Sequence, residues 1–224
     1  MAPAVTLSVI VPAYNEAPTI AEALRRVAAV DVDLEIIVVN DCSTDGTAAE
    51  IEAAGVSGIR VINHPENRGK GAAVRSGLRE ARGDVVVIHD GDLEYDPQDF
   101  VAMIQPILRG EARVVYGYRQ LTSQSRLYRL GNQFLTLLTN LLYGASVRDM
   151  ETCHKMWRRE VLEDVALTAD SFDLEVELTA RFLGRRESIV QLPISYEARS
   201  AKKLRWWVDG PAAVRALLRY RFRR

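Results

Sequence analysis

Short apolar runs alternate with segments of helical periodicity along the first half of the chain. The runs are rich in Val and Ile and are closed by proline, glycine, asparagine or aspartate, which is typical of buried strands that end in loops. Between them, apolar residues recur at three- and four-residue spacing, which predicts helices. The predicted strands cover residues 5–11, 34–39, 59–62, 84–89 and 114–116, and the predicted helices cover residues 18–30, 44–54, 71–82 and 96–108.

This alternation predicts an α/β fold. Continuous apolar strands separated by helices form a mainly parallel, twisted sheet with helices on both faces. Ligands bind to such sheets beyond the carboxyl ends of the strands. Three polar, acid-bearing segments follow predicted strands here, at residues 14–16, 40–41 and 90–92. We therefore expect a ligand site where these segments meet.

The pattern changes after residue 118. Residues 125–143 predict a helix with a broad apolar stripe, which suits either a core helix or a helix that faces a membrane. Two further helices and one strand are predicted over 172–183, from about 211 onward, and over 189–196. Pro193 lies inside that strand and therefore places it at a sheet edge. We find no internal repeat and no linker, so we expect one domain over residues 1–224.

The composition narrows the class of protein. The chain has 224 residues, of which 48% are hydrophobic, which is enough for a core and too much for a disordered chain. The formal charge of −1 gives no sign of a nucleic-acid partner. Residues 199–224, however, contain nine Lys and Arg against one acid. A basic end on an acidic body predicts contact with an anionic surface or ligand.

Cysteine and histidine usage argues against a disulfide framework or a zinc site. Cys42 and Cys153 form no C-x-x-C pair, and the three histidines are scattered. The first residues lack the basic region and cleavage site of a signal peptide. No stretch reaches about 18 uninterrupted apolar residues, the length of a membrane-spanning helix. We therefore expect a cytoplasmic protein.

Two carboxylates end the predicted strand over residues 84–89. Asp90 and Asp92 flank Gly91, and Glu94 follows two residues later. Residues two apart in an extended segment point the same way, so these oxygens can converge on one point. Carboxylates without nitrogen or sulfur ligands suit Mg²⁺ or Mn²⁺. The alternative is that the acids only solvate the strand end.

A glycine-rich loop precedes the predicted helix over 71–82. In the segment 67–71, Asn-Arg-Gly-Lys-Gly, the glycines allow close backbone approach, and the helix N-terminus with Lys70 or Arg68 attracts phosphate. The alternative is a turn with exposed basic side chains. Neither G-x-x-x-x-G-K-[ST] nor G-x-G-x-x-G is present, which argues against an NTPase and a dinucleotide oxidoreductase.

The order of these motifs resembles a known family. SVIVPAYNE, VVNDCSTDGT, NRGKGAAVRSGL and HDGDLEYDP are similar to segments of inverting nucleotide-sugar glycosyltransferases of the GT-A fold. YGYR, DMETCHKMWRREV and PISYEAR resemble the dolichol-phosphate mannosyltransferase group, which makes polyprenyl-phosphate sugars. The resemblance implies metal-dependent transfer of mannose or glucose, from GDP-mannose or UDP-glucose, to a polyprenyl or dolichyl phosphate. As an inverting reaction, it would form no covalent enzyme intermediate.

The resemblance also implies roles for individual residues. It divides the chain into a nucleotide-sugar-binding half, 1–118, and an acceptor-binding half, 119–224, which ends in a basic amphipathic helix. The donor would be bound by Pro12, Tyr14, Glu16, Val39, Asp41, Lys70, Asp90, Gly91 and Asp92. The metal would be held by Asp90, Asp92 and Glu94. The acceptor phosphate would meet Arg119, Arg126, Arg129, Arg199 and Lys203, joined by Lys202. The catalytic set would be Asp90, Asp92 and Arg119.

The nature of the acceptor decides between two versions of this chemistry. A phosphate monoester is already anionic near pH 7, so it needs cationic positioning more than a base. A glycan or other hydroxyl acceptor needs a base, for which Asp149 and Glu175 are the candidates. A third possibility is a subunit that binds nucleotide-sugar without catalysis.

A polyprenyl chain stays in the bilayer, so its acceptor phosphate must be met at the membrane. We therefore expect a peripheral protein on the cytoplasmic face, anchored by its basic tail or by a membrane-protein partner.

Overall fold

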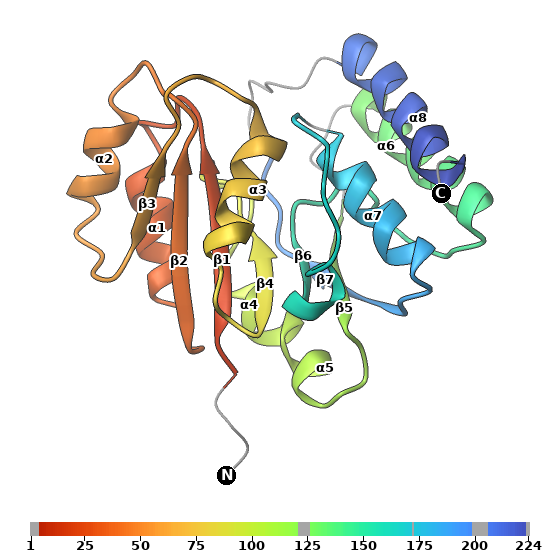
Figure 1. The fold of residues 1–224 in the computed structure, drawn as a ribbon, viewed down its shortest axis with the longest axis horizontal. Coiled ribbons are helices and arrows are strands. Elements are labelled where there is room, and N and C mark those ends of the chain that lie inside the picture. The colour runs from red at the N-terminus through yellow and green to blue at the C-terminus, as the bar shows by residue number, and fades with distance from the viewer. Residues whose placement is uncertain (1–4, 121–125, 172, 199–205, 223–224) are drawn as a thin grey trace.

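The computed structural model describes residues 5–120, 126–171, 173–198 and 206–222. A seven-stranded sheet runs through the molecule in the order β3-β2-β1-β4-β6-β5-β7 (Figure 1). Its strands are β1 (Leu7–Ala13), β2 (Leu34–Asn40), β3 (Arg60–Asn63), β4 (Val85–Ile88), β5 (Val114–Arg119), β6 (Lys155–Arg158) and β7 (Ile189–Ile194). All neighbours are parallel except the two pairs made by β6. The predicted α/β class with a mainly parallel sheet is confirmed.

Helices cover both faces of the sheet. They are α1 (Ile20–Ala28), α2 (Thr47–Ala53), α3 (Lys70–Glu80), α4 (Asp99–Met103), α5 (Gln105–Leu108), α6 (Arg126–Tyr143), α7 (Leu174–Gly184) and α8 (Trp206–Phe222). Figure 1 shows α3 and α7 in front of the sheet and α1 behind it. Strands β1 and β4 are buried on both faces, which accounts for their uninterrupted apolar sequences. None of the described helices combines the length and the apolar character needed to cross a bilayer.

Strand β6 was not predicted. Its sequence, Lys-Met-Trp-Arg, is short and half basic, so it lacks the apolar run that marks the other strands. The structure nevertheless buries Lys155 completely and pairs the strand antiparallel to both β4 and β5. Because β6 lies between them, the residues before and after position 118 contribute to one continuous sheet.

Two helix boundaries also differ from prediction, and both involve proline. The helix expected over 96–108 is divided into α4 and α5, because Pro106 has no N–H to bond back to the preceding turn. Helix α8 begins at Trp206, so Pro211 lies inside it instead of starting it. The prediction for Pro193 is confirmed, since β7 lies at the sheet edge and pairs only with β5.

The first turn of α3 packs closely against the backbone of residues 169–170. A Cβ atom at Gly71 would lie 2.3 Å from the carbonyl oxygen of Ala169. Since this neighbour is backbone, no rotamer change relieves the contact. We expect Gly71→Ala to lower the free energy of unfolding by about 3 kcal/mol, although alanine is the better helix former. Urea denaturation measures this difference.

A control for this prediction is Gly184→Ala at the end of α7. A Cβ atom there would meet no atom within 4 Å. Its stability should stay within about 0.5 kcal/mol of the unmodified chain. Equal stabilities of the Gly71 and Gly184 variants would mean that the close approach of α3 to residues 169–170 is not required by the fold.

Candidate active site

The loops that follow β1, β2 and β4 are bonded to one another, as expected from the order of the strands. The N–H of Asn15 donates to Ser43 Oγ at 3.1 Å, and the N–H of Thr44 donates to Asn15 Oδ1 at 2.8 Å. The hydroxyl of Thr19 donates to the carbonyl oxygen of Gly91 at 2.9 Å. The polar segments predicted to form a ligand site therefore meet at one edge of the sheet.

Lys70 joins two carboxylates from distant parts of the chain. Its Nζ lies 2.8 Å from Asp90 Oδ1, after β4, and 2.8 Å from Glu175 Oε1, in the first turn of α7. Burial opposes the charge of Lys70, but the two carboxylates outweigh burial and raise its pKa well above the usual value. Burial likewise opposes the charge of Asp90, and Lys70 outweighs it and lowers the pKa of Asp90. Both groups are therefore charged at neutral pH.

The glycine-rich loop binds other parts of the protein through its backbone. The N–H groups of residues 68–69 donate to the Asp41 carboxylate at 2.7 to 3.2 Å. The N–H groups of residues 71–72 donate to the carbonyl oxygen of Asp170 at 2.9 and 3.4 Å. These four backbone donors are therefore engaged within the protein, and attraction of phosphate by this helix N-terminus with Lys70 or Arg68 stays a prediction. The ammonium group of Lys70 is what the loop contributes to the site.

Asp41 is itself almost fully buried. Its carboxylate also lies 2.6 Å from His64 Nδ1, and His64 Nε2 lies 2.9 Å from Ser76 Oγ. Asp41 thus fixes the glycine-rich loop to the end of β2, and its contact with the donor base stays a prediction. Other predicted donor residues differ in exposure: Tyr14 is exposed, Pro12 is half-buried, and Glu16 and Val39 are buried.

The three predicted metal ligands, Asp90, Asp92 and Glu94, lie on a turn and not on extended chain. Strand β4 ends at Ile88, before Asp90. Leu93 has a positive φ of 61°, and the N–H of Glu94 donates to Asp92 Oδ1 at 3.1 Å. Strand alternation therefore does not bring these carboxylates together, contrary to the sequence-based argument. Within the described residues, no three acidic, histidine or cysteine side chains gather closely enough to enclose a metal ion.

The donor chemistry of this turn still fits a hard cation. Asp90 and Asp92 offer carboxylate oxygens, which Mg²⁺ and Mn²⁺ prefer, and such ions commonly complete their shell with water or substrate phosphate oxygens. Lys70 supplies the positive charge beside Asp90 in this structure. Asp90 and Asp92 could therefore hold such an ion together with a substrate diphosphate, and the role of Glu94 as a third ligand stays a prediction.

Arg119, at the end of β5, is held by a buried carboxylate. Its Nε and Nη2 lie 2.7 and 2.9 Å from the two oxygens of Asp149, and its backbone N–H donates to Oδ2 at 3.1 Å. Asn132 on α6 donates to Oδ1 of the same group at 3.0 Å. Burial alone would raise the pKa of Asp149, but Arg119 and these hydrogen bonds outweigh burial and lower it. Asp149 is therefore a saturated, ionised carboxylate.

Tyr196, which follows β7, connects the acidic turn to Arg119. Its hydroxyl donates to Glu94 Oε2 at 2.8 Å, and the Arg119 guanidinium lies 5.1 Å from the centre of its ring. This link was not predicted from the sequence, because it joins residues 102 positions apart. The polar contacts thus form two linked groups around the acidic turn, one through Lys70 and one through Tyr196.

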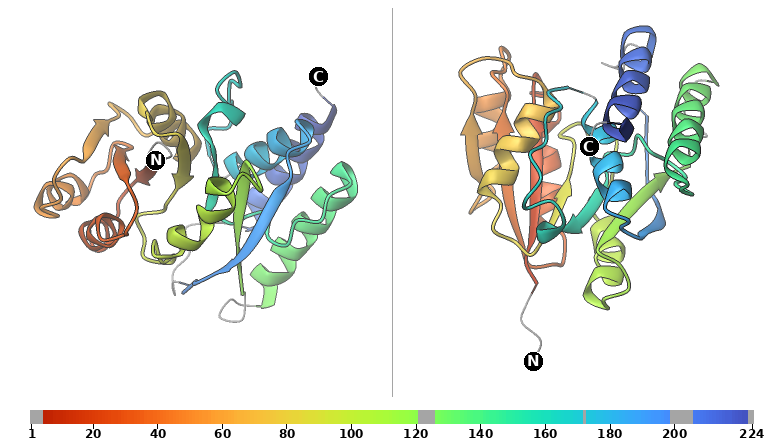
Figure 2. Two further views of the ribbon diagram at one scale, coloured as in Figure 1. Left: turned by 90° about the horizontal axis from the view of Figure 1, so that it is seen from below. Right: turned by 45° about the vertical axis from the view of Figure 1, so that its right-hand side comes forward.

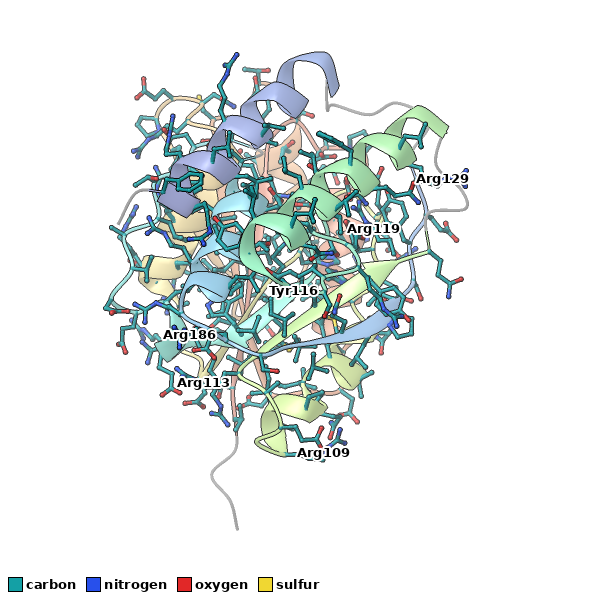
Figure 3. The ribbon with its side chains drawn as sticks, turned by 90° about the vertical axis from the view of Figure 1, so that its right-hand side faces the viewer. Arg109, Arg113, Tyr116, Arg119, Arg129 and Arg186 are labelled. Carbon is teal, nitrogen blue, oxygen red and sulfur yellow. The ribbon has the colours of Figure 1, made fainter. Side chains whose placement is uncertain are left out.

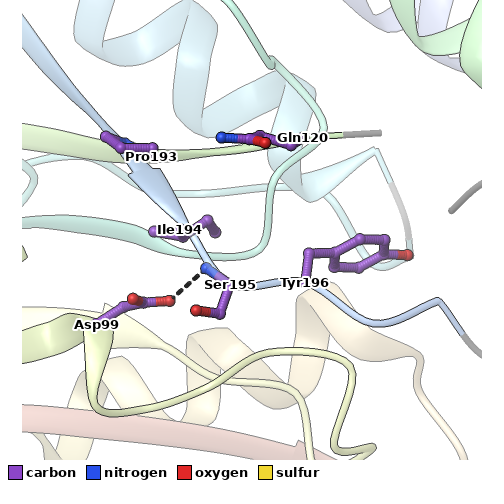
Figure 4. A pocket seen from close by; sticks show the side chains of 6 residues that line it. All are labelled: Asp99, Gln120, Pro193, Ile194, Ser195 and Tyr196. Atoms are coloured by element: carbon purple, nitrogen blue, oxygen red, sulfur yellow. Dashed lines mark hydrogen bonds between the residues drawn. The ribbon is translucent and has the colours of Figure 1, made fainter. Parts of the chain in front are cut away.

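A shallow cavity of about 440 Å³ adjoins Tyr196 (Figure 4). The backbone N–H of Ser195 donates to Asp99 Oδ2 across it at 2.8 Å. The cavity lies next to the ends of β5 and β7, beside the predicted acceptor half of the site. Its lining residues are Asp99, Gln120, Pro193, Ile194, Ser195 and Tyr196.

The buried histidine and cysteine side chains near Asp90 are uncharged. His89 Nδ1 is 3.0 Å from His154 Nε2, so one ring donates to the other. Burial lowers the pKa of His89 to about 4 and that of His154 well below its usual range, so both rings are neutral at pH 7. Burial also raises the pKa of the Cys153 thiol. Lys70 is accordingly the cation that balances Asp90.

Lys155 fixes the segment that carries Asp149. Its buried Nζ donates to the carbonyl oxygens of Met150 and Thr152 at 2.7 and 2.5 Å. Burial lowers the pKa of this lysine to about 8. Sequence reasoning missed this contact because a lysine is ordinarily exposed and nothing in the pattern marked this one as buried.

The remaining predicted acceptor residues are described only in part. Figure 3 labels Arg119 and Arg129 on the side of the molecule where α6 begins, and the Arg129 side chain is half-buried. Arg126 begins α6, but its side chain is outside the described part. Also outside the described residues are Arg199, Lys202 and Lys203.

The carboxyl group of Glu151 is expected to make the stability of the fold depend on pH. Loss of solvation raises its pKa to about 7, against the attraction of Arg119 and with added repulsion from Glu175. The folded state then binds this proton more tightly than the unfolded chain, so stability falls as pH rises from about 4.5 to about 7. We expect Glu151→Gln to lack this fall and to be more stable than the unmodified chain by up to about 2 kcal/mol near pH 8. Thermal unfolding of both proteins across this pH range measures the difference, and parallel profiles would contradict the assigned shift.

Comparisons with known proteins identify similar sugar transferases, and one of these comparisons matches the chain to a family model. The profile described as Glycosyl transferase family 2 matches residues 8–166. A low-salt glycan biosynthesis hexosyltransferase of Haloferax volcanii is 30% identical over 223 residues, covering 95% of this chain and 53% of that protein. A dolichol-phosphate mannosyltransferase of Pyrococcus furiosus is 29% identical over 217 residues, covering 89% of this chain and 59% of that protein. The chain thus spans between half and three-fifths of the length of these two relatives.

Solved structures of glucosyl-3-phosphoglycerate synthase from Mycobacterium tuberculosis share the fold. The complex with Mn²⁺, UDP and phosphoglyceric acid superposes with a TM-score of 0.81 at 24% identity, covering 97% of this chain and 79% of that one. The complex with Mn²⁺, UDP-glucose and glycerol 3-phosphate gives a TM-score of 0.79 at 25% identity, covering 96% and 80%. The sheet and its helices therefore form the arrangement that the sequence resemblance implied.

Proposed function

The chain belongs to glycosyltransferase family 2 and has the GT-A fold, and on that premise we propose that it moves mannose or glucose from a nucleotide-sugar to a polyprenyl phosphate. The polyprenyl-phosphate acceptor is supported by the Pyrococcus furiosus relative, which is named for dolichol phosphate. A metal-dependent reaction is supported by the Mn²⁺ bound with UDP-glucose in the structural relative. The donor is GDP-mannose or UDP-glucose.

We choose a phosphate acceptor because the two carboxylates that could act as a general base, Asp149 and Glu175, are already hydrogen-bonded or ion-paired. Asp149 accepts four hydrogen bonds, and its pKa is lowered, so it is a poor proton acceptor. Glu175 is paired through Oε1 with Lys70. A hydroxyl acceptor would need a base here, whereas a phosphate needs none and is met by Arg119.

We assign the residues to one displacement step. A phosphate oxygen of the acceptor forms the new bond to the sugar C1 as the bond to the nucleoside diphosphate breaks. Residues 1–118 hold the donor, with Lys70 beside its phosphates, and residues 119–224 hold the acceptor, with Arg119 on its phosphate. Asp90 and Asp92 would hold Mg²⁺ or Mn²⁺, which neutralises charge on the leaving diphosphate. Arg129, Arg126, Arg199 and Lys203 are proposed to complete the acceptor site.

A second candidate retains the fold and changes the acceptor to a hydroxyl. It is favoured by Glu175 Oε2, which is buried and has no hydrogen-bond partner among the described residues. That oxygen could accept the proton of an incoming hydroxyl group. The Haloferax volcanii relative, named for glycan biosynthesis, is compatible with such an acceptor.

One assay separates these candidates. Radiolabelled GDP-mannose or UDP-glucose is incubated with the protein, Mn²⁺ or Mg²⁺ and a polyprenyl phosphate, and the lipid is extracted into organic solvent. Metal-dependent entry of label into the organic phase with one donor supports the proposal and identifies the sugar. If both donors bind and neither labels the lipid, the phosphate acceptor is wrong, and glycan acceptors are tested next.

A further inference from the structure

Helix α6 presents apolar side chains to solvent. Four large residues on it are between 58% and 73% exposed, namely Leu130, Phe134, Leu137 and Leu141. Their spacing of four, three and four residues places them along one side of the helix. They form a continuous stripe about 16 Å long, at 1.5 Å per residue. The sequence left open whether this helix belongs to the core or faces a membrane, and the core interpretation is wrong for this stripe.

The opposite side of α6 is buried and carries polar as well as apolar side chains, among them Leu135. Asn132 donates to Asp149, Thr136 Oγ1 accepts from the N–H of Met150, and Thr139 is completely buried. The helix therefore contributes to the core from its buried side and still presents a second, apolar stripe to solvent, which an ordinary surface helix lacks. Its polar contacts serve the loop that holds Arg119, and its apolar stripe contributes nothing to the core.

Helix α8 lies beside α6 (Figure 2). Tyr143 Oη donates to the carbonyl oxygen of Leu217 at 3.3 Å, and Arg221 Nε donates to that of Leu142 at 2.8 Å, so the two helices are bonded together. The exposed side of α8 carries two apolar residues and three arginines, Leu218, Phe222, Arg215, Arg219 and Arg221. Neither 126–143 nor 213–222 contains an acidic residue.

We propose that this surface docks onto an anionic lipid bilayer. The docking surface consists of Leu130, Phe134, Leu137 and Leu141 on α6 together with Leu218 and Phe222 on α8. Exposed apolar side chains on segments whose charged residues are all arginines, as over 126–143 and 213–222, match a membrane interface with negatively charged headgroups. A second copy of the chain is a poorer match, because a two-fold contact through this face would oppose arginine to arginine.

The position of the surface relative to the site is consistent with a lipid acceptor. The stripe begins at Leu130, two residues before Asn132, which bonds the carboxylate that holds Arg119. Docking through α6 would therefore bring the membrane to the side of the molecule where Arg119 and Arg129 lie (Figure 3). This extends the proposed function, but the evidence for docking does not depend on the reaction.

Vesicle sedimentation tests the proposal. The full chain is mixed, without substrates, with vesicles of phosphatidylcholine and phosphatidylglycerol, or of phosphatidylcholine alone. We expect binding to the anionic vesicles, and at least about tenfold weaker binding by the double variant Leu137→Glu, Leu141→Glu. The matched control is Val61→Glu, Leu108→Glu, which makes the same charge change at exposed apolar residues outside α6 and α8 and should bind normally. Unchanged melting temperatures show that both variants are folded.

Two results would overturn the inference. One is equal binding by the α6 variant and the control. The other is failure of the unmodified chain to bind vesicles, with sedimentation velocity showing a dimer that the α6 variant abolishes, since the surface would then contact a second copy. Sugar transfer to a short polyprenyl phosphate in detergent tests the reaction separately. If the protein binds vesicles through α6 but transfers no sugar in this assay, the docking inference stands and the proposed function is wrong.

Discussion

Asp92→Asn is expected to transfer sugar at least about a thousandfold more slowly than the unmodified chain. The substitution keeps the size of the side chain and the oxygen that accepts the N–H of Glu94 at 3.1 Å, so the turn after β4 should persist. It removes the negative charge with which Asp92 would bind a divalent cation beside the donor diphosphate. Asp92 is a cleaner choice than Asp90, whose carboxylate also pairs with Lys70. The measurements are kcat at saturating donor and the Mn²⁺ concentration that gives half-maximal rate.

Glu94→Gln is the matched control. Glu94 accepts the Tyr196 hydroxyl at 2.8 Å, and glutamine can accept the same bond through its carbonyl oxygen. If Asp90 and Asp92 suffice for the metal, this variant keeps its Mn²⁺ requirement within about threefold, whereas a third ligand would lose far more. Transfer by Asp92→Asn at the normal rate and metal concentration would remove the metal role from this turn.

The parts of the fold that depend on local pattern were predictable. β1, β2 and β4 consist of apolar runs, and the helices between them have clear periodicity, so their order already implied the sheet and the edge at which ligands bind. β6 was missed because its stability comes from pairing with β4 and β5 and from the burial of Lys155. No single-sequence pattern reports that a lysine will be buried.

The candidate site was predictable in its residue types and not in its contacts. The sequence places Lys70 and Asp90 near one sheet edge. Glu175, which also pairs with Lys70, lies on α7, 105 positions after Lys70 in the chain. Glycines before a helix commonly accompany phosphate binding, which is why the sequence predicts phosphate at this loop. The bonds from the N–H groups of residues 68, 69, 71 and 72 to Asp41 and Asp170 could not be predicted, because they depend on tertiary packing.

The pair of Arg119 and Asp149 allows the two acceptor chemistries to be separated. If Asp149 serves to hold Arg119 on the acceptor phosphate, Asp149→Asn should lower kcat/KM for polyprenyl phosphate about a hundredfold, mainly through KM. The asparagine NH₂ group cannot accept the hydrogen bonds that one carboxylate oxygen now receives, so the guanidinium loses its two-point contact. Arg119→Lys keeps the charge without that geometry and should show a similar loss. Donor binding, measured by nucleotide titration, should be unaffected in both variants.

If Asp149 were a general base, these variants would show a different pattern of kinetic changes. Were Asp149 the proton acceptor for a hydroxyl, Asp149→Asn would lower kcat with little change in KM, and Arg119→Lys would not reproduce it. Glu175→Gln supplies the parallel test for the other candidate base, and its effect should be read with Lys70 in mind, because the two side chains are paired at 2.8 Å. Breaking the buried ion pair of Arg119 also costs stability, about 3 kcal/mol or more, so rates are compared well below the melting temperature of each variant. A kcat effect confined to Asp149→Asn would therefore replace the phosphate acceptor with a hydroxyl one.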